Sequence, residues 1–84
     1  MEEFFRQRLS QLRAQKGVSA RDMSLSLGQS ESYINKIENG KSLPSMQVFF
    51  YICDYFGISP QEFFDAENRN PTAAGALADD IKTL

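Results

Sequence analysis

Residues 30–41 carry side chains whose hydrogen-bonding groups suit the edges of nucleobases. Lys36 can donate to guanine O6 or N7, Ser32 can pair with several base edges, and Glu31 can accept from cytosine N4. The same residues also fit a polar helix face that contacts only solvent. Which interpretation applies depends on the elements that surround this segment.

Residues suited to catalysis or to metal binding are scarce. The chain has no histidine and a single cysteine, Cys53. It therefore lacks the commonest metal ligand and acid–base group, and it cannot form an internal disulfide. Its other ionisable residues are scattered at helical spacing, which is typical of solvated faces. We expect no catalysis, no cofactor and no bound metal.

Charge is distributed unevenly along the chain. The net charge of −2 alone argues against a polyanion as partner, because phosphate neutralisation supplies most DNA affinity. Residues 1–41 nevertheless carry +2, whereas residues 42–84 carry −4. Any surface that faces DNA is therefore expected in the first half of the chain.

The length of 84 residues and the apolar content of 42 % suit one small domain with one core. No apolar run approaches the roughly 20 residues of a membrane span, and the opening residues lack the basic start and long apolar stretch of a signal peptide. The expectation is a cytoplasmic protein with neither a membrane partner nor a small-molecule substrate.

Helical patterns organise the first half of the chain. An amphipathic helix is predicted over residues 2–16, and Gly17 ends it. Two short helices then flank a glycine turn at Gly28; Ser19 can cap the first of them, and Ser30 is the expected cap of the second. This order is typical of a helix-turn-helix, whose second helix can enter the major groove of DNA.

Two further helices are predicted in the second half. Pro44 suits the first turn of a strongly apolar helix that extends to Phe56 and is expected at the centre of the core. Ser59-Pro60 starts a short fifth helix.

The last residues follow a different pattern. Residues 68–71 are typical of a linker, and beyond them Ala74, Leu77, Ile81 and Leu84 form one apolar stripe on a weak terminal helix. We therefore predict a domain over residues 1–67, followed over residues 68–84 by a linker and a C-terminal helix that could serve dimerisation.

The ordered series of these features resembles the lambda-repressor/Cro-type helix-turn-helix family of bacterial and phage regulators. The resemblance runs from about Leu9 to Phe64. It is carried by Leu12-Arg13, Gly17, Met23, Leu27-Gly28-Gln29-Ser30, Tyr33-Ile34, Ile37-Glu38-Asn39-Gly40-Lys41, Pro44, Phe49, Ile52, Phe56-Gly57-Ile58-Ser59-Pro60 and Phe63-Phe64. It implies an all-α fold of five helices, no cofactor, and commonly a homodimer on a two-fold operator of double-stranded DNA.

The resemblance places base contacts on and around the third helix. The residues concerned are Glu31, Ser32, Tyr33, Asn35 and Lys36. Tyr33 can instead pack its ring against the turn, and Glu31 would repel phosphates if it were misplaced.

Contacts to phosphates, which fix register without reading sequence, are expected at the ends of the helix pair. The residues concerned are Ser19, Ala20, Arg21, Ser30, Asn39 and Lys41. The family usually carries a phosphate-gripping glutamine where this chain has Ala20, so that contact is lost. Arg21 and the N–H groups of the helix start could replace it, although Asp22 partly opposes an anion there.

Two further sets of residues are assigned structural roles. Arg13 and Glu38 match a pair that in this family tends to form a partly buried ion pair; a DNA contact by Arg13 is the alternative. The aromatic residues exceed what one small core readily hides, so some are expected at a subunit interface, with a compact aromatic core as the alternative. The interface candidates are Phe50, Tyr55, Phe63, Phe64, Leu77, Ile81 and Leu84.

The sequence therefore predicts a sequence-specific DNA-binding transcriptional regulator, a small repressor that reads a two-fold operator through the major groove. The alternative is a protein-interaction module, such as an antitoxin-like partner or an anti-regulator. It would retain the fold and bind another protein through its acidic, aromatic second half.

Overall fold

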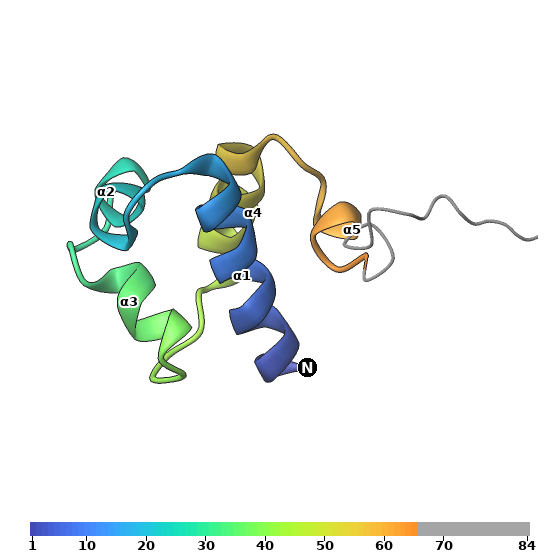
Figure 1. Cartoon of the computed structure of the whole chain (residues 1–84), viewed down its shortest axis with the longest axis horizontal. Coiled ribbons are helices and arrows are strands. Elements are labelled where there is room, and N and C mark those ends of the chain that lie inside the picture. Colours follow the sequence, from blue (N-terminus) through green and yellow to red (C-terminus); the bar gives the residue numbers. More distant parts are fainter. Residues whose placement is uncertain (66–84) are drawn as a thin grey trace, which may run out of the picture.

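The computed structural model describes residues 1–65, which form helices joined by short turns (Figure 1). The helices are α1 (Glu2–Lys16), α2 (Ala20–Ser26), α3 (Tyr33–Glu38), α4 (Met46–Phe56) and α5 (Pro60–Phe63). The predicted all-α fold with five helices is confirmed. The predicted linker and C-terminal helix, with Leu77, Ile81 and Leu84, lie outside the described residues.

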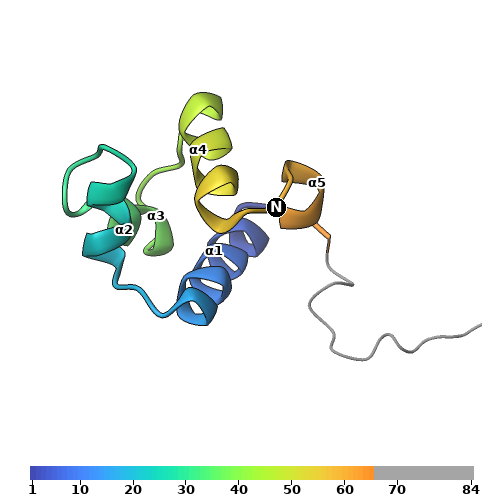
Figure 2. The same ribbon diagram turned by 90° about the horizontal axis from the view of Figure 1, so that it is seen from above.

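Helices α1 and α4 form the middle of the molecule. The α2–α3 pair lies on one side of them and α5 on the other, in both the view of Figure 1 and the perpendicular view of Figure 2. Within residues 1–65, no helix is long and apolar enough to cross a bilayer.

Apolar residues from all five helices form a single core. The buried members are Phe5, Leu9, Leu12, Met23, Leu27, Ile34, Ile37, Phe49, Ile52, Cys53 and Phe63. The predicted central position of α4 is borne out by Phe49, Ile52 and Cys53, whereas Phe56 is only partly buried.

An aromatic cluster closes the core at the α5 end. Phe63 has no exposed surface, and its ring centroid lies 5.0 Å from that of Phe5 and 5.2 Å from that of Phe49. Its assignment to a subunit interface was therefore wrong, because its own protomer covers it completely. Phe50 and Phe64 remain 48 % and 38 % exposed.

The ring of Tyr55 contacts Phe56 and Lys16 within its own protomer. Its ring is half-buried beside Phe56, and the Lys16 ammonium lies 4.9 Å from the ring centroid. A cation over an aromatic face is attracted by the ring quadrupole. Tyr55 is therefore a weaker interface candidate than Phe50 or Phe64.

Arg8 attaches α1 to the end of α5. It is only 6 % exposed, and its guanidinium donates to the carbonyl oxygens of Phe63 at 2.7 Å and Glu62 at 3.0 Å. These are carbonyls at the C-terminal end of a helix, where a cation is favoured. Arg8 lies three residues after Phe5 and four before Leu12, on the apolar stripe of α1, which is the one sequence signal of its inward position.

Capping residues set the ends of the last two helices. The Ser45 hydroxyl accepts from the Val48 N–H, so α4 begins at Met46 and Pro44 lies outside it rather than in its first turn. At α5 the expected start is confirmed, since Ser59 and Glu62 bond to each other's backbone N–H groups in a complete capping box.

Candidate nucleic-acid interface

A tight turn joins α2 to α3. Gly28 has φ of 76°, a conformation that favours glycine, and its N–H donates to the Leu25 carbonyl at 3.0 Å. The Gln29 N–H then donates to the Ser24 carbonyl, also at 3.0 Å. The predicted glycine turn is therefore present, and it brings α3 back across α2.

Ser30 does not cap α3. The helix begins at Tyr33, because the Ser30 carbonyl accepts from the Tyr33 N–H at 3.1 Å and closes a turn over residues 30–33. Ser32 occupies the cap position, but its side chain makes no capping hydrogen bond.

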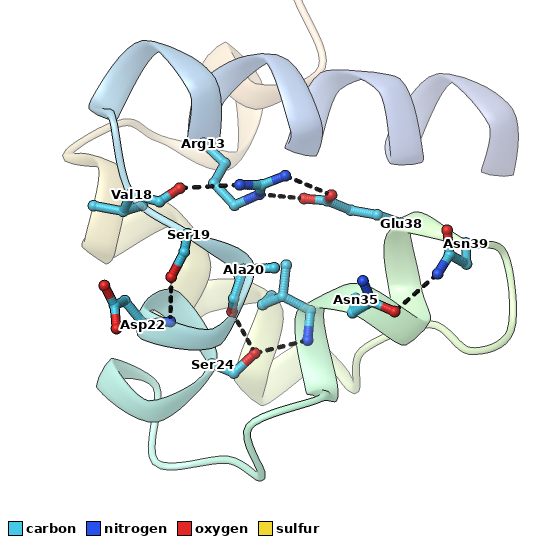
Figure 3. A network of polar contacts seen from close by, with 10 residues as sticks. Arg13, Val18, Ser19, Ala20, Asp22, Ser24, Asn35, Glu38 and Asn39 are labelled. Atoms are coloured by element: carbon cyan, nitrogen blue, oxygen red, sulfur yellow. Dashed lines mark hydrogen bonds and ion pairs between the residues drawn. The ribbon is translucent and has the colours of Figure 1, made fainter.

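The cap is supplied instead from α2, by Ser24 (Figure 3). Its hydroxyl has no exposed surface; it accepts from the Ile34 N–H at 2.9 Å and donates to the Ala20 carbonyl at 2.7 Å. One buried serine thus satisfies an otherwise unpaired N–H of α3 and fixes α3 against α2. The only sequence signal was its spacing, three residues before Leu27, on the inward side of α2.

Replacing Ser24 with alanine is expected to lower the free energy of unfolding by about 1 to 3 kcal/mol, because the Ile34 N–H would stay buried without an acceptor. Urea unfolding measures this change. Ser26→Ala is the matched control, since Ser26 is exposed on the same helix. Equal stability of the two variants would contradict the capping role.

Arg13 and Glu38 join α1 to α3 (Figure 3). Nε and Nη2 of Arg13 donate to the two carboxylate oxygens of Glu38 at 2.8 and 3.0 Å, while Nη1 donates to the Val18 carbonyl at 3.0 Å. The two side chains are 25 % and 12 % exposed. The hydrogen bond with Glu38 is the main cause that raises the pKa of Arg13. The Arg13 guanidinium therefore links α1 both to α3, through Glu38, and to the segment that leads into α2, through Val18.

The outward side of α3 and of the turn before it carries the candidate base contacts. Glu31, Asn35 and Lys36 are exposed, and Ser32 is half-exposed. Tyr33 is partly buried against the core, and this burial raises the pKa of its hydroxyl. Tyr33 is therefore partly covered by its own protomer, whereas the other four side chains are accessible to a partner.

The turn after α3 carries two candidate phosphate contacts. The Asn39 side-chain amide donates to the Asn35 side-chain oxygen at 2.9 Å (Figure 3). The Lys41 N–H donates to the Lys36 carbonyl at 2.8 Å, and both lysine side chains are exposed. Asn39 is thus tied to Asn35 on the outward side of α3, and Lys41 remains accessible.

Arg6, on α1, lies against this turn, and nothing in the sequence indicated that contact. Gly40 has φ of 77°, and a side chain there would meet the Arg6 guanidinium at 3.5 Å. Arg6 also donates to the Glu38 carbonyl at 3.5 Å and forms an ion pair with Glu3. The turn therefore lies against α1.

The start of α2 differs from the expectation in one respect. The Ser19 hydroxyl accepts from the Asp22 N–H at 3.0 Å, as a cap should, and Ala20 packs partly against the core. Arg21, however, forms an ion pair with Glu31, from Nε to Oε1 at 2.6 Å. Arg21, which was expected to contact a phosphate, and Glu31, which was expected to contact a base, are thus bonded to each other.

A family model described as helix-turn-helix matches residues 9–63, which is more than half of the chain. The chain belongs to the lambda-repressor/Cro-type helix-turn-helix family. It is therefore a DNA-binding helix-turn-helix regulator, from a family that is generally non-enzymatic. Neither a curated protein nor a solved structure matched the chain.

Fewer cations are free to face DNA than the sequence suggested. Of the seven cations in residues 1–41, Arg8 and Arg13 bond internally and Arg21 is paired with Glu31. Lys36 and Lys41 are the exposed cations on and just after α3. Since phosphate neutralisation supplies most DNA affinity, the helix-turn-helix should bind non-specific DNA weakly.

Proposed function

We propose that this regulator is a sequence-specific repressor that binds a two-fold DNA operator as a homodimer. One observation carries the proposal: α3 is anchored on its inner side and accessible on its outer side. Ile34 and Ile37 have no exposed surface, while Asn35 and Lys36 between them are exposed. A helix held in this way can enter the major groove without rearranging the core.

Base reading in this proposal depends on three side chains of different chemistry. Lys36 donates to guanine O6 or N7, Asn35 pairs with adenine N6 and N7, and Ser32 contacts either base type. Tyr33, packed against the core, would contribute at most the edge of its ring.

Phosphate contacts would come mainly from the turn after α3, through Asn39 and Lys41. Ser19 and Ser30 could add hydroxyl contacts, whereas Ala20 could offer only its backbone N–H. With the family's glutamine absent, this set is small, and we expect modest affinity and correspondingly strong dependence on base contacts.

An apolar groove supports the proposed homodimer. It is lined by Met1, Glu2, Phe5, Leu43, Pro44, Met46, Phe49 and Phe64, with a volume of about 250 Å³. Met46 is 66 % exposed and Leu43 is 52 % exposed. The groove is lined by the start of α1, by the segment before α4 with the first turns of α4, and by Phe64. None of these lining residues belongs to α2 or α3, so a second copy seated there would leave the α2–α3 pair uncovered. Two copies could then bind successive major grooves and, on an operator that overlaps a promoter, exclude polymerase.

Selection from random duplexes tests the proposal. The expected result is a paired motif with half-site centres about 34 to 36 Å apart. Lys36→Gln should then weaken binding to the selected site roughly 10- to 100-fold and relax base preference at one position, as expected for the loss of one base contact. Lys16→Gln removes the same charge from α1 and is the control. Absence of any enriched motif at low salt would contradict the proposal.

Salt dependence separates DNA binding from the alternative of a protein-interaction module. Each phosphate contact should steepen the fall of log affinity by about 0.9 per log unit of salt. A flat response would favour the protein-interaction module. Sedimentation at the concentrations used for DNA binding reports whether the protein is a dimer.

A further inference from the structure

The ion pair between Arg21 and Glu31 lies on the accessible side of the helix-turn-helix. It joins the first turn of α2 to the segment just before α3. Both side chains are about two-thirds exposed, at 64 % and 65 %. The hydrogen bond that Arg21 donates to Glu31 is the main cause that raises the pKa of Arg21. An exposed pair of this kind contributes little to folding stability, so its placement calls for another explanation.

Both partners keep hydrogen-bonding groups for a ligand. The contact uses Nε of Arg21 and Oε1 of Glu31. Within residues 1–65, the other carboxylate oxygen and the two Nη groups make no hydrogen bond. The pair therefore presents one acceptor next to a fork of donors, and it carries no net charge.

This combination matches one base pair better than it matches a phosphate. In the major groove, a G·C pair presents the acceptors N7 and O6 of guanine beside the N4 donor of cytosine. A phosphate presents only acceptors and would be repelled by Glu31. The Arg–Glu hydrogen bond also favours one orientation of the carboxylate, so that less freedom is lost on binding.

We propose that Arg21 and Glu31 read one G·C base pair as a unit. Glu31 accepts from cytosine N4, and Arg21 donates through its Nη groups to guanine O6 and N7 while it orients Glu31. The inference rests on the proposed function. It gives Arg21 a role in base reading in place of the phosphate contact that the sequence suggested.

The test measures base preference at every position of the selected half-site. Wild type, Arg21→Ala, Glu31→Ala and the double variant are compared by competition with duplexes that carry each of the four base pairs at each position. We expect one position at which the wild type prefers G·C by about tenfold or more. Each single variant should lose most of that preference, the double variant should lose no more, and preferences elsewhere should persist.

Two controls separate geometry from charge. Arg21→Lys keeps the charge but not the fork, so it should lose the G·C preference while the salt dependence stays unchanged. Asp54→Asn removes an exposed carboxylate from α4 and should leave every preference as in the wild type.

The possible negative results distinguish failure of this inference from failure of the proposed function. If Arg21→Ala weakened binding to all duplexes equally and made the salt dependence shallower by about 0.9, Arg21 would be a phosphate contact and the inference would be wrong. If the wild type selected a motif whose G·C preference survived in both single variants, only the inference would fail. A wild type that selected no motif would overturn the proposed function, and this inference with it.

Discussion

Arg13→Ala is expected to lower the free energy of unfolding by about 3 to 5 kcal/mol, enough to unfold much of a domain of this size. The variant leaves the carboxylate of Glu38, only 12 % exposed, without its cation. It also removes the bond from Arg13 to the Val18 carbonyl, which fixes the approach to α2. Loss of DNA binding in this variant would therefore reflect loss of the fold.

The reactivity of the Cys53 thiol measures this loss of stability. Its thiol is 2 % exposed, and burial raises its pKa, so a thiol reagent should modify it only when the domain opens. Reaction rates in Arg13→Ala should exceed those of the wild type by about 100- to 4,000-fold under the same conditions, the factor that corresponds to about 3 to 5 kcal/mol. Arg21→Ala, which removes an exposed arginine and its ion pair, is the control and should leave the stability nearly unchanged. Similar rates in the two arginine variants would contradict this account.

Phe63→Ala is expected to cost about 3 to 5 kcal/mol, the usual range for removing a fully buried aromatic ring. Phe63 has no exposed surface, and its ring packs on Phe5 and Phe49. The cavity would also lie beside the carbonyl to which Arg8 donates, so the attachment of α5 to α1 would weaken as well.

Phe64→Ala is the matched variant, since Phe64 is the next residue and is 38 % exposed. Thermal unfolding should show a clearly smaller loss for Phe64→Ala, whereas sedimentation should show any effect on self-association in that variant. The opposite result, a weakened dimer with an intact Phe63→Ala protomer, would restore Phe63 to the interface.

Local chemistry was predictable where a residue and its partner are close in sequence. Ser59 and Glu62 bond to each other across one helical turn, so the start of α5 could be predicted from their spacing. The end of α1 at Gly17 followed from the same kind of short-range signal. The family pattern also predicted the pairing of Arg13 with Glu38, which spacing alone could not indicate.

Features that depend on a distant partner were missed or misplaced. Ser30 had the right type for a cap, but the acceptor that α3 uses is Ser24, ten residues before Ile34 on another helix. Arg8 resembled a surface cation because its acceptors, Glu62 and Phe63, lie more than fifty residues away. Such contacts form only when the helices pack, and one sequence gives no direct signal of them.

The hydrogen bond between Asn39 and Asn35 bears on how binding preference could change over time or by design. A substitution at Asn35 intended to alter the proposed base preference would also release the side-chain amide of Asn39, which is a proposed phosphate contact. Grafting the outer residues of α3 from a relative should therefore transfer preference poorly unless residue 39 is exchanged as well. A new operator preference would then arise through paired substitutions at residues 35 and 39 rather than through single ones.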